Sequence, residues 1–427
     1  MSHIGTIAGS VFANWLAVTF YVLFHSIYDI RLEGLENYTA SPSSLITINH
    51  KRDLDIPVVA SILHLRKTAF KNRLRMHFVA RDDLFCPGFL TAHFPIFGIT
   101  GKLVHRINLK PVMKALQAHP ISQLVRNRIS YLMREIMRID GNLQLKQVIK
   151  PEGLEKFTQL LGMRNGFRLD DIKVSDFLGY SFCKLHHQVA DKNILQGRLT
   201  RAIREKTLTA INEQLKDIAL ILDGGGICML APEGQLSPDG RFWPVKSGLF
   251  RLFSMTTSNI RVLPVNTTYD FMTRGRMRIY MTIGPELIDL RNYNKVELEQ
   301  RVQKSIVTSG PITLGHLGSE YLLEILNEGR ETFEELGLRD ALSLRIEKLG
   351  AGNIRLEERL LTEPSLNRRV HDFLTYCVNK GIVSNIGNGS YRVSKSVIEN
   401  DTYDKFHENP VRYSANELKS ILELHAL

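Results

Sequence analysis

A histidine and an aspartate five residues apart, His50 and Asp55, form the pair in this chain best suited to proton transfer. Imidazole ordinarily titrates close to neutrality, so it can accept a proton at working pH. A carboxylate bound to its other ring nitrogen fixes the tautomer and stabilises the imidazolium. The sequence has no G-x-S-x-G nucleophile elbow and no Cys–His arrangement beside the pair. We therefore expect the histidine to activate a hydroxyl that arrives on a substrate.

The same segment also has a purely structural interpretation. Asp53 precedes Leu54-Asp55-Ile56 and can cap a helix N-terminus, and Pro57 fits the first turn of that helix. Residues five apart on one helix do not share a face. The pair can act only if His50 lies in the turn before the helix and Asp55 in its first turn. We assign Asp53 as the cap and Asp55 as the partner of the histidine.

Composition limits the class of protein. The 427 residues suffice for two domains, or for one large domain with an appendage. The four cysteines are far apart and form no C-x-x-C pair, which favours reduced thiols in a cytosolic compartment. The net charge of +11 arises in residues 51–150, which hold 18 Lys and Arg against 6 Asp and Glu. Such a basic region can bind nucleic acid, an anionic membrane or a polyphosphate.

An uncharged N-terminal stretch favours the membrane among these partners. Residues 4–24 carry no charged side chain and include Trp15 and Tyr21, and about 20 apolar residues are enough to span a bilayer. No basic region precedes the stretch, which argues against a signal peptide. We expect a membrane-associated helix over residues 1–27, inserted or interfacial, with a buried soluble helix as the alternative. The protein would then lie at the cytoplasmic face of a membrane.

The spacing of apolar residues predicts an α/β layer structure, because short apolar runs alternate with helical patterns. Strands are expected at 28–32, 45–48, 76–80, 103–104, 227–230, 262–265 and 277–281. Helices are expected over about 55–70 and 205–223, and Gly224-Gly225-Gly226 ends the second of them. Residues 110–205 have a mostly helical pattern and would form an insertion.

The chain after about residue 291 is rich in helical patterns. A helix over 367–380 is expected, followed by a hairpin around Asn388-Gly389. Helix and hairpin resemble the end of a winged helix, but few basic residues lie there, so we expect no nucleic-acid partner. The expected organisation is an N-terminal helix (1–27), an α/β domain (28–290) and a helical C-terminal domain (291–427).

A second group of candidate site residues follows the strand expected at 227–230. It begins with the adjacent pair Glu233-Gly234 and continues with Ser237 and Lys246. A glycine beside a carboxylate at a strand end permits close backbone approach and exposes N–H groups, which suits an anionic ligand. Taken alone, the segment could equally be a turn in which Glu233 caps the next element.

Together, the two segments resemble the glycerophospholipid acyltransferase family, the lysophosphatidate and glycerol-phosphate O-acyltransferases. That family combines an N-H-x4-D block, a basic segment ending in Arg, a P-E-G-x-x-S block and a V-P-V strand. The corresponding segments here are, in the same order, Asn49–Asp55, Gly101–Arg106, Pro232–Ser237 and Leu263–Val265. The resemblance implies an acyltransferase-type mixed sheet flanked by helices over residues 28–290.

The resemblance also implies transfer of a fatty acyl group from acyl-CoA or acyl carrier protein to an acceptor hydroxyl. His50 would be the general base and Asp55 its orienting partner. The substrate-binding residues would be Arg106, Glu233, Gly234, Ser237 and Lys246. Of these, Arg106 would hold the acceptor phosphate, which a guanidinium can bind bidentately. No metal or redox cofactor is implied, and the partners would be the thioester donor, a lipid acceptor and an anionic membrane surface.

The chain departs from the family pattern on the acceptor side. Gln235-Leu236 replaces the usual Thr-Arg and removes a phosphate-binding arginine, which Arg241 or Lys246 could replace. His105 stands where an aspartate is usual, and residues 110–205 lengthen the gap between the second and third blocks. Two alternatives therefore stay open: acylation of another lysophospholipid or lipid hydroxyl, and a catalytically idle lipid-binding scaffold.

Overall fold

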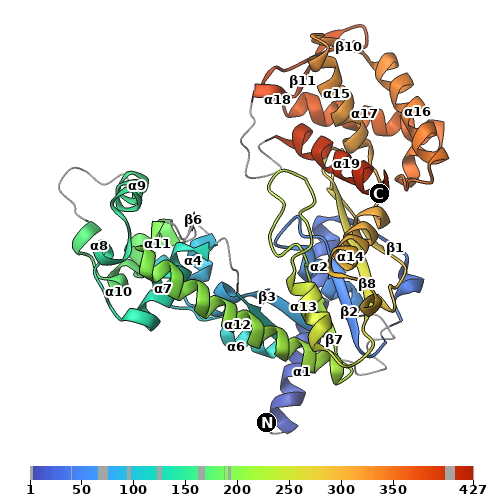
Figure 1. The fold of residues 1–427 in the computed structure, drawn as a ribbon. Helices are drawn as coiled ribbons and strands as arrows, with labels where there is room; N and C mark the ends of the chain where they lie inside the picture. Colours follow the sequence, from blue (N-terminus) through green and yellow to red (C-terminus); the bar gives the residue numbers. More distant parts are fainter. Residues whose placement is uncertain are drawn as a thin grey trace. The chain divides into compact units, whose positions relative to one another are not determined.

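The computed structural model of the protein describes residues 3–39, 41–65, 76–93, 98–122, 127–161, 169–186, 188–190, 194–399 and 409–426. These residues form a mixed α/β fold, as the sequence predicts. They divide into two compact units (Figure 1). The first unit comprises Met1–Met76 and Ile221–Leu427, and the second comprises His77–Leu220. Both the His50–Asp55 pair and the Pro-Glu-Gly turn belong to the first unit.

Among the described residues of the first unit, five strands form a mixed sheet in the order β1-β9-β8-β2-β7. The central strand β2 (Ser44–Ile48) pairs in parallel with β7 (Ile227–Leu230) and with β8 (Arg261–Asp270). Next, β9 (Arg278–Ile283) pairs antiparallel with β8 and parallel with β1 (Asp29–Glu33). All of β2 is buried, as expected of a strand covered on both faces. Because β2 and β7 are adjacent and parallel, their carboxyl ends bring the two predicted site segments together.

Two helices pack against each other near the start of the first unit, α1 (His3–Ile27) and α2 (Asp55–His64). Nε2 of His64 lies 2.6 Å from Oδ1 of Asn14 at their contact. The helix expected over about 55–70 is confirmed as far as His64, and 66–70 lie outside the described residues. None of the described helices has the length and apolar character that a bilayer crossing requires. Association of α1 with a membrane stays a prediction.

Two local predictions are wrong. The strand expected at 103–104 is part of helix α5 (Gly98–His105), because so short an apolar run does not distinguish strand from helix. Asp53 does not cap α2: it is exposed, and Leu54 occupies the N-cap position without a side-chain hydrogen bond. The carboxylate that binds backbone N–H groups in this turn belongs to Asp55.

The described part of the second unit is mostly helical, as predicted for residues 110–205. Its parallel pair is β3 (Met76–Arg81), which enters this unit at His77, with β4 (Ala118–Ile121). Its antiparallel pair is β5 (Asn127–Arg128) with β6 (Val189–Ala190). Its helices include α4 (Phe89–His93), α5, α6 (Lys110–Ala115), α7 (Ile129–Asp140), α8 (Leu145–Val148), α9 (Pro151–Leu161), α10 (Val174–Phe177), α11 (Cys183–His186) and most of α12 (Gly197–Asp223). A hydrophobic core with fully buried Leu132, Ile136 and Phe177 holds this unit together.

The C-terminal part of the first unit combines helices with a small sheet. Its elements in chain order are α14 (Lys295–Ser309), α15 (Leu314–Asn327), β10 (Thr332–Glu334), α16 (Glu335–Ala351), α17 (Glu363–Asn379), β11 (Val383–Gly387), β12 (Ser390–Val393), α18 (Ser396–Glu399) and α19 (Pro410–Ala426). The predicted hairpin is confirmed as β11 and β12, and β10 extends it in the order β10-β12-β11. The last helix, α19, contacts α14 and α15 (Figure 1).

A buried ion-pair network joins these helices to the sheet. Arg369 of α17 is fully buried and binds Asp270 at the end of β8 at 2.8 Å and Glu357 at 2.7 Å. Tyr280 of β9 donates to Glu357 at 3.1 Å. Removing one member of such a network leaves an uncompensated buried charge, which typically costs roughly 3–5 kcal/mol. The C-terminal helices are therefore an integral part of the first unit.

Candidate functional site

His50 and Asp55 lie together at the carboxyl end of β2. The strand ends at Ile48, and Asp55 is the first residue of α2. Nδ1 of His50 lies 3.4 Å from Oδ2 of Asp55, and the His50 side chain is 15% exposed whereas that of Asp55 is completely buried. When Nδ1 carries the proton and donates to Asp55, Nε2 is the basic nitrogen. The pair thus has the arrangement that its sequence spacing required.

The carboxylate of Asp55 organises the turn that carries the histidine. Its Oδ2 accepts hydrogen bonds from the backbone N–H groups of Lys51 at 2.6 Å and Arg52 at 2.7 Å. Its Oδ1 accepts from two hydroxyls on β8, that of Thr267 at 3.3 Å and that of Tyr269. A buried carboxylate needs such donors because leaving it unpaired is costly. Asp55 is therefore both the orienting partner of the histidine and the centre of the turn.

Asn49 fixes the end of β2 to the neighbouring strand β8. The residue is completely buried, and its amide nitrogen donates to the carbonyl of Thr267 at 3.0 Å. Its amide oxygen accepts from the N–H of Thr267 at 2.7 Å and lies 3.1 Å from the Thr267 hydroxyl oxygen. The sequence placed Asn49 in the first block without a role. In the structure, these hydrogen bonds attach the end of β2 to β8 and so fix the backbone position of the next residue, His50.

The Pro-Glu-Gly turn holds the main chain of His50 from the side of β7. Glu233 is buried, and its two carboxylate oxygens accept hydrogen bonds from the backbone N–H groups of His50 and Trp243, each at 3.0 Å. The N–H of Ser237 donates to the carbonyl of His50 at 2.9 Å. Both main-chain polar groups of His50 are thus bound by the second segment. Glu233 is a positioning residue in this arrangement.

The other predicted residues of this segment shape its surface. Gly234 has a φ of +65°, which favours glycine, and a Cβ there would lie 3.4 Å from the Lys246 side chain. The hydroxyl of Ser237 donates to the carbonyl of Arg241 at 2.7 Å, so it is used within the turn. Lys246 is exposed, and its N–H donates to the carbonyl of Pro232 at 2.8 Å. Lys246 therefore offers an exposed cation beside the glycine turn.

Arg106, the predicted phosphate ligand, belongs to the second unit. It is exposed directly after α5. The preceding His105 is held within that unit, with Nδ1 2.8 Å from the Thr91 hydroxyl and Nε2 3.1 Å from the carbonyl of Leu178. The role of Arg106 in binding an acceptor phosphate stays a prediction.

Burial dominates the electrostatics around His50. It raises the pKa of Glu233 to about 7, against the opposing effect of the N–H groups of His50 and Trp243. Burial, and then the adjacent carboxylate of Asp55, raise the pKa of Tyr269 well above its ordinary value. The Tyr269 hydroxyl therefore stays protonated and donates a hydrogen bond to Asp55. The guanidinium of Arg52 lies 4.3 Å from the centre of the Tyr269 ring.

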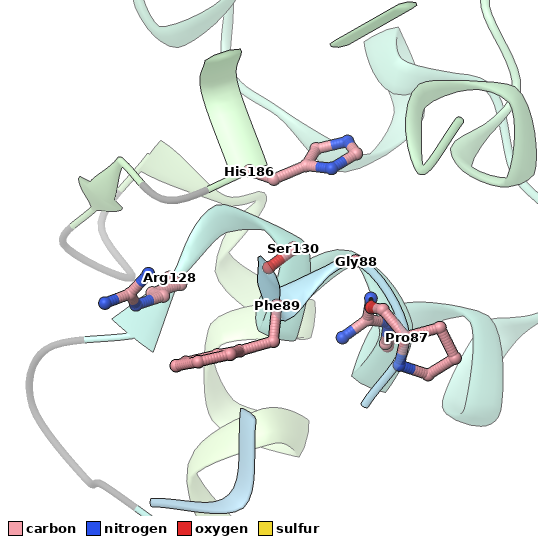
Figure 2. A pocket seen from close by; sticks show the side chains of 7 residues that line it. Pro87, Gly88, Phe89, Arg128, Ser130 and His186 are labelled. Carbon is pink, nitrogen blue, oxygen red and sulfur yellow. Dashed lines mark hydrogen bonds between the residues drawn. The ribbon is translucent and has the colours of Figure 1, made fainter. Parts of the chain in front are cut away.

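A small pocket lies in the second unit beside the N-terminus of α7. Its lining residues are Pro87, Gly88, Phe89, Arg128, Ser130, Arg134 and His186 (Figure 2). Arg134 donates to the carbonyl of Pro87, and Nε2 of His186 lies 2.7 Å from the carbonyl of Phe177. These contacts are made within the protein itself. None of these lining residues belongs to the site predicted from the sequence.

Comparison with known proteins identifies no relative from which the function of this site could be inferred. No protein-family model matches the chain, and no curated protein matches it. Within the described ranges, no group of three or more His, Cys, Asp or Glu side chains is placed to bind a metal ion.

We predict that Glu233→Gln alters the pH dependence of stability. The folded pKa of Glu233, about 7, lies above its ordinary value of 4.5, so the folded protein holds this proton more tightly. The stabilising contribution of Glu233 is therefore complete below pH 4.5 and is lost as the pH rises to about 7. Because glutamine does not titrate, the unfolding free energy of the variant should rise relative to wild type across this interval and then stay level.

Urea unfolding at a series of pH values measures this difference. Glu155→Gln, on the exposed surface of α9, is the matched control and should show no such change. A difference between Glu233→Gln and wild type that is independent of pH would contradict the assignment.

Proposed function

We propose that the protein is an O-acyltransferase at the cytoplasmic face of a membrane. It would move a fatty acyl group from acyl-CoA or acyl carrier protein to the hydroxyl of a lysophosphatidate-like or glycerol-phosphate acceptor. The convergence of two distant segments on His50 carries this proposal. Glu233, 183 residues away in sequence, accepts a hydrogen bond from the backbone N–H of His50. Asp55 contacts Nδ1 of the His50 ring. The resemblance of both segments to blocks of the glycerophospholipid acyltransferases supports the same chemistry.

In the proposed reaction, Nε2 of His50 takes the proton of the acceptor hydroxyl as its oxygen attacks the thioester carbonyl. Asp55 holds the Nδ1–H group and stabilises the imidazolium. The tetrahedral intermediate then expels the thiolate, which receives the proton from the imidazolium, so the products are an ester and a free thiol. General-base catalysis of this kind typically contributes roughly 10²–10⁴-fold. The reaction as written uses no metal or redox cofactor.

Fewer residues support the identity of the acceptor than support the acyl-transfer chemistry. Lys246, exposed beside the glycine turn, is the cation of the first unit that we propose for its phosphate, and the resemblance gives Arg106, also exposed, as the other candidate. Leu236 occupies the position of the family's arginine, which favours a second candidate, the acylation of another lysophospholipid or lipid hydroxyl. An idle lipid-binding scaffold is the third candidate. It is disfavoured because a scaffold has no need for an accessible histidine backed by a buried carboxylate.

The surface of α1 supports the proposed membrane association. Large apolar side chains at helical spacing are exposed along one face of it, namely Val11, Trp15, Val18 and Val22. At the C-terminal end of α1, Arg276 donates to the carbonyls of His25 at 2.9 Å and Ser26 at 3.4 Å. Arg274 is also exposed in this β8–β9 turn. An apolar helix face next to basic side chains suits an anionic lipid interface.

Thiol release tests the proposed reaction. Full-length protein incubated with acyl-CoA, or with acyl carrier protein thioester, and a panel of lyso-lipids should release thiol and form the acylated lipid. His50→Ala should lower turnover by roughly 100-fold or more, because it removes the base. His371→Ala, on the exposed surface of α17, should match wild type. Undiminished turnover in His50→Ala, or no turnover by wild type with any acceptor, would reject the proposal.

Vesicle flotation tests the membrane contact. The double variant Trp15→Gln/Val22→Gln should bind vesicles rich in phosphatidylglycerol at least about tenfold more weakly, because burial of each large apolar side chain contributes roughly 1.5–3 kcal/mol. Leu344→Gln, an equally exposed apolar position on α16, should leave binding unchanged. Equal binding by wild type and the double variant would exclude this face of α1 as the contact.

A further inference from the structure

The last helix of the chain contacts both segments that hold His50. We infer that α19 is part of the active-site scaffold and that Glu417 and Asn416 on it are positioning residues for His50. The inference rests on the proposed function of His50 as a base. It gives the C-terminal helices, for which the sequence suggests no role, a part in the proposed catalysis.

Glu417 binds the residue that follows His50. Lys51 and Glu417 form an ion pair in which their side chains are only 3% and 2% exposed. The backbone N–H of Lys51 is one of the two that bind Asp55. Lys51 is thus held to Asp55 by its main chain and to α19 by its ammonium group. Its ammonium also lies 5.0 Å from the centre of the Phe242 ring, close to the second segment.

His316 of α15 supports Glu417 from the other side. Its Nδ1 accepts a hydrogen bond from the N–H of Thr313 at 3.1 Å, so Nε2 carries the proton and lies 3.5 Å from Oε1 of Glu417. Burial alone would raise the pKa of Glu417, but Lys51 and His316 outweigh it and lower that pKa to about 2. Glu417 is therefore ionised at neutral pH. Removing its charge would leave the buried ammonium of Lys51 uncompensated.

The same helix contacts the loop after the Pro-Glu-Gly turn. Nδ2 of Asn416 donates to the carbonyl of Asp239 at 3.0 Å. Gly240 has a φ of +88°, and a Cβ there would lie 2.1 Å from the carbonyl oxygen of Tyr413, so only glycine lets the loop lie this close to α19. This loop also carries Ser237, whose N–H binds the carbonyl of the proposed base. One helix therefore supports both segments.

A separate network attaches the C-terminal helices to the sheet. Arg369 of α17 binds Asp270 and Glu357 without involving α19. Loss of the Glu417 charge should therefore loosen the two segments around His50 without detaching the C-terminal helices. Because the two sets of contacts are separate, a variant of Glu417 can test the positioning of His50 without removing the Arg369 network that supports the fold.

Hydrogen exchange of the full-length chain, read by mass spectrometry, tests the inference. In Glu417→Gln, amides in 50–55 and 233–241 should exchange roughly tenfold faster, because their local opening becomes easier, while those of β1 and β9 keep their wild-type rates. In the thiol-release assay, kcat should fall while KM for the acyl donor stays within about twofold. Glu423→Gln, exposed on the same helix, is the matched control and should behave as wild type.

Asn416→Asp gives a second test that keeps the Lys51–Glu417 pair intact and applies even if Glu417→Gln fails to fold. It should speed exchange in 233–241, because it replaces the donor to the Asp239 carbonyl with an acceptor. Wild-type exchange of 50–55 and 233–241 in Glu417→Gln, or of 233–241 in Asn416→Asp, would overturn the inference, as would an equal increase in all elements in either variant. If wild type releases no thiol with any acceptor, the proposed reaction fails, and the exchange pattern still decides whether α19 positions His50.

Discussion

At the carboxyl end of β2, the fully buried carboxylate of Asp55 accepts hydrogen bonds from the two backbone N–H groups of Lys51 and Arg52 and from two hydroxyls on β8. A charge in this position is tolerated only while its donors stay in place. The turn, the neighbouring strand and the first turn of α2 are therefore fixed relative to one another. Nδ1 of His50 lies 3.4 Å from Oδ2 of Asp55, the same oxygen that accepts hydrogen bonds from both N–H groups.

A second buried carboxylate continues this arrangement. Glu233 binds the N–H of His50, so three successive N–H groups, those of residues 50, 51 and 52, are bound by two acidic side chains. The side chain of Lys51 is in turn balanced by Glu417 of α19. Backbone held in this way would lose little further freedom on binding the proposed substrate, which is the advantage of preorganisation. The sheet, the Pro-Glu-Gly turn and the last helix thus contribute to the position of one imidazole.

Local patterns predicted the parts of this site that depend on neighbouring residues in sequence. The apolar runs of β2 and β7 identified the two strand ends, and the spacing of His50 and Asp55 predicted their contact. The prediction that Asp53 caps α2 is wrong because, from sequence alone, Asp53 and Asp55 are equally able to bind the backbone N–H groups of this turn. The difference lies in the donors on β8, 212 residues further along the chain for Thr267. The Lys51–Glu417 pair spans 366 residues, and no local pattern indicates it.

One buried carboxylate, that of Asp55, both shapes the turn and orients the proposed base. The turnover number of Asp55→Asn in acyl transfer tests it most directly, because asparagine preserves the size of the side chain but not its charge or its ability to fix the histidine tautomer. We expect kcat to fall by roughly 10²–10⁴-fold in a variant that remains folded. A folded Asp55→Asn variant with the kcat of wild type would contradict the claim.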